Sequence, residues 1–359
     1  MNSFTGLAAV SQRKKNTRSK ATTRSKGTTI GIENSKNKMF APGGIKLNTP
    51  FISPPLAGIS SKPFRTLNRK FGCEFSFLEM IHCRSLAHSS KKTFELLKFT
   101  DDELPLGVQL LGESEDFILK ALEKIEKYPF SLVDFNAACP KKKVVSKGEG
   151  ATLLKTPKKL AGLLKAVVRN CSKPVSVKIR LGWNDASGAL DAALLCEDAG
   201  IKAIFIHGRT RSQGYSGEVD YGTLAEIKKR IKIPMIASGN ILNAVMAKKM
   251  FDETGCDAIT VARGSLGNPW IFREIKEYME KGILLPRPGL KEVMEVMKFH
   301  FNLSNDFYGT KRGILHFKKF FIWYTRSFRG AKPLRRGIAG INTMEGIMDI
   351  MAGFEKTGG

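Results

Sequence analysis

The stretch PVSVKIRLGWNDASGALDAALLCEDAGIKAIFIHGRT, residues 174–210, is the most informative about the fold. Its ends, 174–180 and 202–207, are short apolar runs rich in β-forming residues, which is typical of buried strands. The segment 187–200 between them has the period of a helix. A strand, a helix and a second strand in this order predict a parallel βαβ unit.

The same alternation extends from this unit in both directions. Further strands are predicted near 49–53, 75–80, 105–110, 132–136, 233–238 and 257–262, and further helices at 113–127, 157–170 and 242–254. Eight strands followed by helices favour a closed (β/α)8 TIM barrel, an α/β fold, over an open doubly wound sheet. No G-x-G-x-x-G motif follows the first strand, which also argues against a dinucleotide-binding fold.

Three segments are expected along the chain. Residues 1–45 are basic and rich in Ser, Thr and Gly, and predict a disordered N-terminal arm. The barrel occupies 46–285, and a small C-terminal helical domain follows at 290–357, after Pro286 and Pro288.

Charge indicates the class of partner. The chain has 59 Lys+Arg against 33 Asp+Glu, a net charge of +26, which favours binding to phosphates. Within 311–336 there are nine basic residues and no acid, a pattern typical of contacts with a nucleic-acid backbone. The aromatic residues among them, Phe317, Phe320, Phe321, Trp323 and Tyr324, are at helical spacing and are more often core residues than base-stacking platforms.

Composition excludes several other classes. No apolar run approaches the roughly 20 residues that a bilayer requires, so we expect no membrane association. The six cysteines include no C-x-x-C pair, which predicts neither a zinc site nor a disulfide framework and fits a reducing, cytoplasmic location. We expect no bound metal and a monomer.

Polar residues follow almost every predicted strand, and in a (β/α)8 barrel the active site gathers at these strand ends. The loops after the last two strands commonly hold a phosphate, so Gly239, Gly264 and Arg263 are candidates for a cofactor phosphate. Lys178 and Arg180 point to one side of their strand. The expected cofactor-binding residues are Pro54, Pro55, Leu56, Gln109, Lys178, His207, Ser238, Gly239, Asn240, Ala262, Arg263 and Gly264.

Cys139 is the sharpest candidate for a catalytic residue. It follows the fourth strand and precedes Pro140 and the basic run Lys141, Lys142 and Lys143. A thiol of ordinary pKa is protonated at neutral pH and can donate a proton, whereas nearby lysines would lower the pKa and favour a nucleophile. The sequence leaves both roles open.

The tail around Tyr308-Gly309 and Trp323-Tyr324 looks most like the bacterial B-type branch of the tRNA-dihydrouridine synthase family, and several earlier segments together resemble the same family. They are PPLAGISSKPFR at 54–65, VQLLG at 108–112, DFNAACPKKKVVSKGEGATLL at 134–154, VKIRLGW at 177–183, HGRTRSQGYSG at 207–217 and ARGSLGNPWIF at 262–272. The resemblance spans roughly 45–340. It departs from the family pattern at Ala138, at PPLAG, and at His82, Cys83 and Arg84.

The resemblance implies an enzyme that binds FMN, is reduced by NADPH or NADH, and converts uridines of tRNA to 5,6-dihydrouridine. Hydride passes from flavin N5 to uracil C6, and Cys139 protonates C5. FMN contacts are implied for Gln109, Lys178, His207, Asn240 and Arg263. Contacts with the substrate are expected from Asn136, Arg180 and Arg209. The helical domain would bind the RNA.

Three alternatives remain open in the sequence. The same chemistry could act on ribosomal RNA. The chain could instead be a flavin reductase of small molecules, of the dihydroorotate-dehydrogenase type, although the basic C-terminal segment argues against it. The departures from the family pattern on the first two strands leave a catalytically idle RNA-binding or folding helper as the third.

Overall fold

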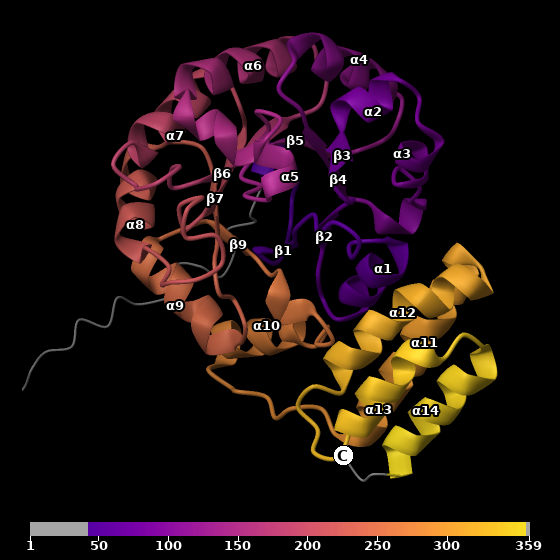
Figure 1. Ribbon diagram of the computed structural model, residues 1–359. Coiled ribbons are helices and arrows are strands. Elements are labelled where there is room, and N and C mark those ends of the chain that lie inside the picture. Colours follow the sequence, from indigo (N-terminus) through magenta and orange to yellow (C-terminus); the bar gives the residue numbers. More distant parts are fainter. Residues whose placement is uncertain (1–41, 357–359) are drawn as a thin grey trace, which may run out of the picture. The chain divides into compact units, whose positions relative to one another are not determined.

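The computed structural model of the protein describes residues 42–356, so the predicted N-terminal arm lies, up to residue 41, outside the described residues. The strands are parallel and form one sheet of order β2-β1-β9-β8-β7-β6-β5-β4-β3, which closes because β2 also pairs with β4 (Figure 1). The predicted (β/α)8 barrel is confirmed. The strands are β1 (Phe51–Ser53), β2 (Phe75–Phe77), β3 (Ile81–His82), β4 (Leu106–Leu111), β5 (Leu132–Ala137), β6 (Val175–Arg180), β7 (Ala203–His207), β8 (Met235–Ser238) and β9 (Ala258–Thr260).

Helices follow the strands and surround the barrel (Figure 1). Those of the barrel are α1 (Lys62–Lys70), α2 (Cys83–Ala87), α3 (Lys91–Glu95), α4 (Glu115–Glu126), α5 (Lys142–Val145), α6 (Pro157–Arg169), α7 (Ala189–Asp198), α8 (Tyr221–Arg230), α9 (Ala244–Thr254) and α10 (Ile271–Lys281). Local sequence sets their ends. For α9, the side chain of Asn243 accepts a hydrogen bond from Met246 N at 2.8 Å, and Gly255 ends the helix with φ of +64°.

The second strand of the barrel is interrupted, which the sequence did not predict. Phe77 lies opposite Gly107 and Ile81 lies opposite Leu110, so one extra residue is accommodated between β2 and β3. An extra residue of this kind makes a bulge, which redirects side chains. The prediction of one continuous strand over 75–80 was therefore wrong at its end.

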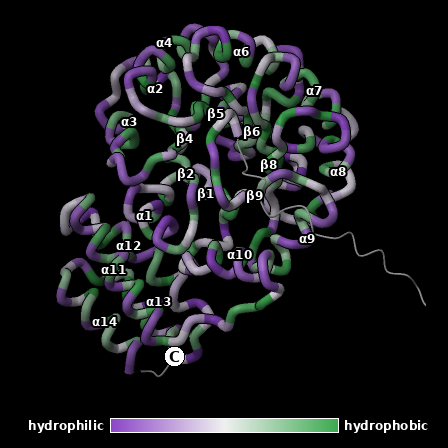
Figure 2. Tube along the Cα trace, turned by 180° about the vertical axis from the view of Figure 1, so that it is seen from behind, coloured by the Kyte–Doolittle hydropathy of each residue, from purple (hydrophilic) through white to green (hydrophobic). Residues whose placement is uncertain are grey.

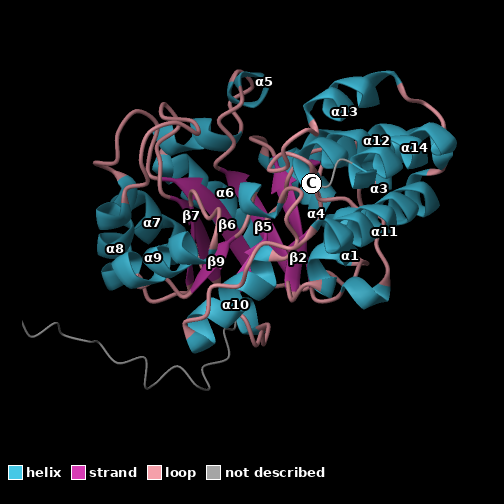
Figure 3. Ribbon diagram, turned by 90° about the horizontal axis from the view of Figure 1, so that it is seen from below, coloured by secondary structure: helices cyan, strands magenta, loops and turns pink. Residues whose placement is uncertain are grey.

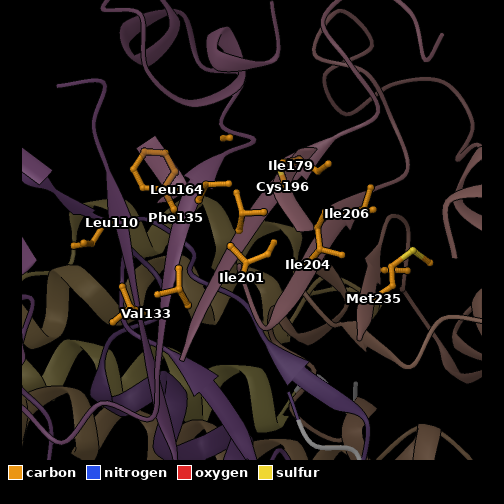
Figure 4. Packing of buried hydrophobic residues seen from close by; sticks show 14 of the residues in the cluster. Leu110, Val133, Phe135, Leu164, Ile179, Cys196, Ile201, Ile204, Ile206 and Met235 are labelled. Carbon is orange, nitrogen blue, oxygen red and sulfur yellow. The ribbon is translucent and has the colours of Figure 1, made fainter. Parts of the chain in front are cut away.

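Successive side chains of each strand point alternately outward and inward, so the barrel has two separate cores. Side chains that point outward, such as Val133, Phe135 and Ile204, pack against the helices (Figure 4). Apolar side chains that point inward form a plug inside the barrel, in which the ring of Phe77 lies 5.5 Å from that of Phe205. In Figure 2 the helices around the barrel alternate between hydrophilic and hydrophobic residues. The inward side chains near the carboxyl ends of β5 and β6, Asn136, Lys178 and Arg180, are polar and line a cavity.

The C-terminal segment is helical, as predicted, and comprises α11 (Leu290–Tyr308), α12 (Thr310–Tyr324), α13 (Lys332–Gly337) and α14 (Met344–Lys356). Phe317, Phe320, Phe321 and Tyr324 are buried in a cluster that also contains Phe64 of α1 and Trp270, just before α10. The aromatic residues of α12 are thus mainly core residues. Among residues 42–356, no helix has the length and apolarity needed to cross a membrane.

Candidate active site

A cavity of about 490 Å³ opens at the carboxyl ends of the strands, and its size is within the range of ligand sites in proteins. The short helix α5 projects from the same end of the barrel (Figure 3). The lining includes most of the residues predicted from the sequence: Pro54, Pro55, Leu56, Gln109, Asn136, Cys139, Lys178, Arg180, His207, Ser238, Gly239, Asn240, Ala262 and Arg263.

Two predicted residues lie behind the lining. Arg209 is buried and donates from Nε to Ser216 O at 2.9 Å and from Nη2 to Gly217 O at 2.7 Å, so it ties down the loop between β7 and α8. At Gly264, a Cβ atom would lie 2.2 Å from Ile241 O. A side chain at 264 would therefore push apart the loops that follow β8 and β9.

The floor of the cavity carries a hydrogen-bonded polar network below Cys139. Gln109 Nε2 donates to Asp134 Oδ2 at 2.6 Å, and Asn136 Nδ2 donates to Gln109 Oε1 at 2.7 Å. Asn136 Oδ1 then accepts from Cys139 N at 2.9 Å. The residues of β4 and β5 that face the barrel axis thereby connect to the backbone of the cysteine.

The thiol of Cys139 is half-buried at the mouth of the cavity. Burial is the largest influence on its pKa and raises it; Arg180 and Lys141 oppose this effect but do not overcome it. The thiol therefore remains protonated at neutral pH. Of the two roles that the sequence left open, this environment favours the proton donor over the nucleophile.

One side of the cavity is strongly basic. Burial, and after it the positive charges of Arg180, Lys178, Arg209 and Arg263, lower the pKa of His207 to about 2. The imidazole is therefore neutral at physiological pH. Burial also lowers the pKa of Lys178 to about 8, against the opposing effect of Asp134.

Polar atoms without a hydrogen-bond partner on the basic side of the cavity fit an anionic ligand. In the described part of the chain, His207 Nδ1 and Arg209 Nη1 are buried without a hydrogen-bond partner. A Cβ atom at Gly239 would lie 3.7 Å from that Arg209 nitrogen, and Gly239 itself lines the cavity with φ of +143°. Buried polar atoms of this kind are costly unless a ligand or water satisfies them. A phosphate or an anionic ring would accept from Arg209 Nη1 and, in the tautomer that is protonated on Nδ1, from His207.

The loop after β8 has an unusual backbone that supports this interpretation. Asn240 adopts φ of +51°, which is uncommon for a residue other than glycine, and its Oδ1 accepts from Arg263 Nη2 at 2.8 Å. Strained conformations of this kind concentrate at ligand sites. The hydrogen bond joins the residues that follow β8 and β9, the two strands after which a barrel of this type commonly binds phosphate.

Arg180 organises the loops above the cavity. Its Nε donates to Ala138 O at 2.8 Å, and its Nη1 donates to Gly214 O at 2.7 Å. Its guanidinium also lies 5.4 Å from the ring centre of Tyr215, a residue that is 52% exposed at the cavity mouth. Arg180 thus joins the loop of Cys139 to the loop after β7.

The loop formed by residues 54–58 is held from two sides. Glu79, in the interruption between β2 and β3, accepts a hydrogen bond from Gly58 N. Lys319 of α12 donates to Gly58 O. The C-terminal helical segment therefore contacts the loop whose residues Pro54 and Leu56 line the cavity.

Sequence reasoning missed several residues of the site. Asp134 could have been found, because it alternates with Asn136 in the D-F-N motif and must point to the same side of β5. Tyr215 lay within the recognised HGRTRSQGYSG segment. Glu79 and Lys319 had no local signal, since only tertiary packing brings them to Gly58. His82, Cys83 and Arg84, where the chain departs from the family pattern, are not part of the cavity lining.

A closed parallel barrel whose polar side chains converge on one cavity at the carboxyl ends of its strands is the architecture of a (β/α)8-barrel enzyme. The sequence profile described as Dihydrouridine synthase (Dus) matches residues 51–354. The chain belongs to the dihydrouridine synthase family.

Relatives of known name support this assignment. The chain is 37% identical over 295 residues to tRNA-dihydrouridine synthase B of Pseudomonas aeruginosa, covering 82% of this chain and 89% of that protein. It is 32% identical over 313 residues to tRNA-dihydrouridine synthase B of Vibrio cholerae, covering 87% and 97%. Among solved structures, histamine dehydrogenase from Rhizobium sp. 4-9 shares the fold, with a TM-score of 0.50, 12% identity, and coverage of 74% of this chain and 51% of that chain.

Proposed function

We propose that this protein reduces uridines in tRNA to 5,6-dihydrouridine with a bound FMN, and that NADPH restores the reduced cofactor. Membership of the dihydrouridine synthase family and the names of the relatives support tRNA as the substrate. The observation that carries the proposal is the protonated thiol of Cys139 at the mouth of a cavity with a buried basic side.

FMN would be held by the residues that line the basic side. Gly239, Asn240 and Arg263 would hold its phosphate. The unsatisfied donor of Arg209 fits an anionic group there, as does His207 in the tautomer that carries its proton on Nδ1. When bound, the flavin supplies the hydride that reduces C6 of the uracil. Lys178, on the floor of the cavity, would stabilise negative charge on the ring.

Cys139 would act as the general acid. As C6 becomes saturated, C5 gains electron density and takes a proton from the thiol, so the C5–C6 double bond becomes a single bond and the thiolate remains. Arg180 and Lys141 would stabilise this thiolate, since both already lower the pKa of the thiol. Asn136 and Arg180 would hold the uracil, which must leave its base stack to reach the cavity.

The C-terminal helical segment would bind the phosphate backbone of the RNA. Six of the nine basic side chains at 311–336 are exposed: Lys311, Arg312, Arg326, Arg329, Lys332 and Arg336. Phosphate contacts of this type position an RNA without reading its bases, so the shape of the tRNA would select the uridine. We further propose that the protein acts in the cytoplasm as a monomer.

The proposal is tested by mapping dihydrouridine in total RNA from cells with and without the gene. We expect the mass gain of two hydrogen atoms at defined tRNA uridines to disappear with the gene and to return with the wild-type protein but not with Cys139→Ala. Loss confined to ribosomal RNA would move the substrate to that RNA. Unchanged RNA would refute the proposal. Parallel assays with NADPH and NADH identify the reductant.

A further inference from the structure

We propose that Asp134, a carboxylate buried below the cavity, is a positioning residue that sets the backbone of Cys139 through the side chains of Gln109 and Asn136. Asp134 is 1% exposed, Gln109 1% and Asn136 6%, so water does not compete for these hydrogen bonds. Asp134 itself is not part of the cavity lining.

The path from Asp134 to the cysteine consists of three consecutive hydrogen bonds. They measure 2.6 Å from Gln109 Nε2 to Asp134 Oδ2, 2.7 Å from Asn136 Nδ2 to Gln109 Oε1, and 2.9 Å from Cys139 N to Asn136 Oδ1. The same Asn136 oxygen accepts from Ala138 N at 3.1 Å. The side chain of Asn136 thus holds two successive backbone N–H groups of the cysteine loop.

The chemistry of the two ends gives the path a fixed direction. The backbone N–H groups of Ala138 and Cys139 can only donate, and an ionised carboxylate can only accept. Each amide between them must therefore present its oxygen toward Cys139 and its nitrogen toward Asp134. A reversal of either amide would place two donors or two acceptors face to face in a buried site, which is costly.

The neighbours of Asp134 allow this direction to persist in both protonation states. Ser176 Oγ donates to Asp134 Oδ1 at 2.6 Å, and Lys178 is the neighbouring charge. If Asp134 takes up a proton on Oδ1, that oxygen can donate to Ser176 while Oδ2 still accepts from Gln109. Asp134 therefore orients the path whether or not it is charged.

The consequence for catalysis rests on the proposed function. A general acid must lie within hydrogen-bond reach of the atom that it protonates, and small displacements reduce the rate strongly. Gln109 and Asn136 both line the cavity, so the path that fixes Cys139 also fixes two side chains that would face the cofactor or the base.

The test exchanges the acid between positions 134 and 109. In Gln109→Glu, two carboxyl groups face each other where Gln109 Nε2 and Asp134 Oδ2 now lie 2.6 Å apart. In the double variant Gln109→Glu/Asp134→Asn, the amide introduced at position 134 can donate to the carboxylate introduced at position 109 and accept from Ser176. Donors and acceptors then match again, and the net charge equals that of the wild type.

The readout is alkylation of Cys139 by iodoacetamide, mapped by peptide mass spectrometry. Half-buried Cys171, which lies outside the cavity lining, is the internal reference. The ratio of Cys139 labelling to Cys171 labelling therefore reports the exposure of the cysteine loop and corrects for the amount of protein and reagent.

We expect Gln109→Glu to raise the Cys139-to-Cys171 labelling ratio about tenfold and the double variant to return it to within about twofold of wild type, since residues in one network are energetically coupled. Ser176→Ala, which removes a hydrogen bond to the same carboxylate outside the path, should leave the ratio near that of wild type. A double variant that resembles Gln109→Glu would overturn the proposal, as would Ser176→Ala with the same labelling as Gln109→Glu.

Folding and activity provide two further readouts. If Gln109→Glu does not fold, recovery of folded protein in the double variant supports the coupling, and failure to recover contradicts it. Labelling uses neither flavin nor RNA, so a restored ratio in a protein that leaves RNA unreduced would refute the proposed function and not the role of Asp134.

Discussion

Replacing Lys319 by methionine tests whether the C-terminal helical segment holds the loop of the proposed flavin site. Methionine keeps the length of the side chain and its packing on α12 but removes the donor to Gly58 O. A hydrogen bond from a charged donor contributes about 1.5–3 kcal/mol. Because Lys319 is only partly buried, we reduce this to about 1–2 kcal/mol. Glu79 still accepts from Gly58 N, so the loop is loosened and not released.

Loss of the hydrogen bond from Lys319 to Gly58 should weaken the binding of FMN, since Pro54, Pro55 and Leu56 of the same loop line the cavity. A cost of about 1–2 kcal/mol corresponds to an increase in Kd of about 5- to 30-fold, measured by titrating apoprotein with FMN and following flavin fluorescence. Lys318→Met is the matched control, because Lys318 is the adjacent residue and donates to Ala339 O at 2.8 Å, away from the loop. Both variants lose one positive charge. If they bind FMN with the same Kd, the reasoning is refuted.

Three further outcomes are expected. Cys139→Ala should slow tRNA-dependent oxidation of the reduced enzyme by about 10²- to 10⁴-fold, which is the usual contribution of a general acid, and should retain the affinity for FMN. Single-turnover absorbance of the flavin measures the rate. An unchanged rate would exclude the thiol as the acid. Burial raises the pKa of Asp134 from 3.8 to about 6, so the folded state binds this proton more tightly than the unfolded state and stability falls as pH rises between these values. The free energy of unfolding of wild type minus that of Asp134→Asn should thus decrease by on the order of 2–3 kcal/mol from about pH 4 to pH 7, as measured by urea unfolding; a constant difference would contradict the shift. Replacing both Arg326 and Arg329 by glutamine should reduce the slope of log K for tRNA against log salt by about 0.7–0.9 for each phosphate that is no longer neutralised, and an identical slope would place the RNA elsewhere.

The local pattern of the sequence was sufficient to predict the architecture and most of the residues that line the cavity. Each of the eight predicted strands overlaps a strand of the barrel, because buried parallel strands are short apolar runs separated by helical segments. Once the barrel is known, strand ends must meet at one opening, so Gln109, Asn136, Lys178 and His207 could be placed together from their positions alone.

The interruption between β2 and β3 could not be predicted in this way. Residues 75–80 were predicted as one strand, and nothing within 75–82 shows that four steps from Phe77 to Ile81 are matched by three on β4. Register is a property of two strands, and here it determines where Glu79 meets the loop of Gly58.

The barrel, the basic character of the chain and the choice of Cys139 as the candidate catalytic thiol could all be predicted from the residues in order, because periodicity, composition and motif are local quantities. That this thiol remains protonated follows only from the folded chain, where burial outweighs the neighbouring positive charges. The same is true of Arg209, which supports a loop behind the lining, and of Lys319, which reaches Gly58. Burial, hydrogen-bond partners and contacts between distant segments depend on the packed chain as a whole, and no single stretch of residues encodes them.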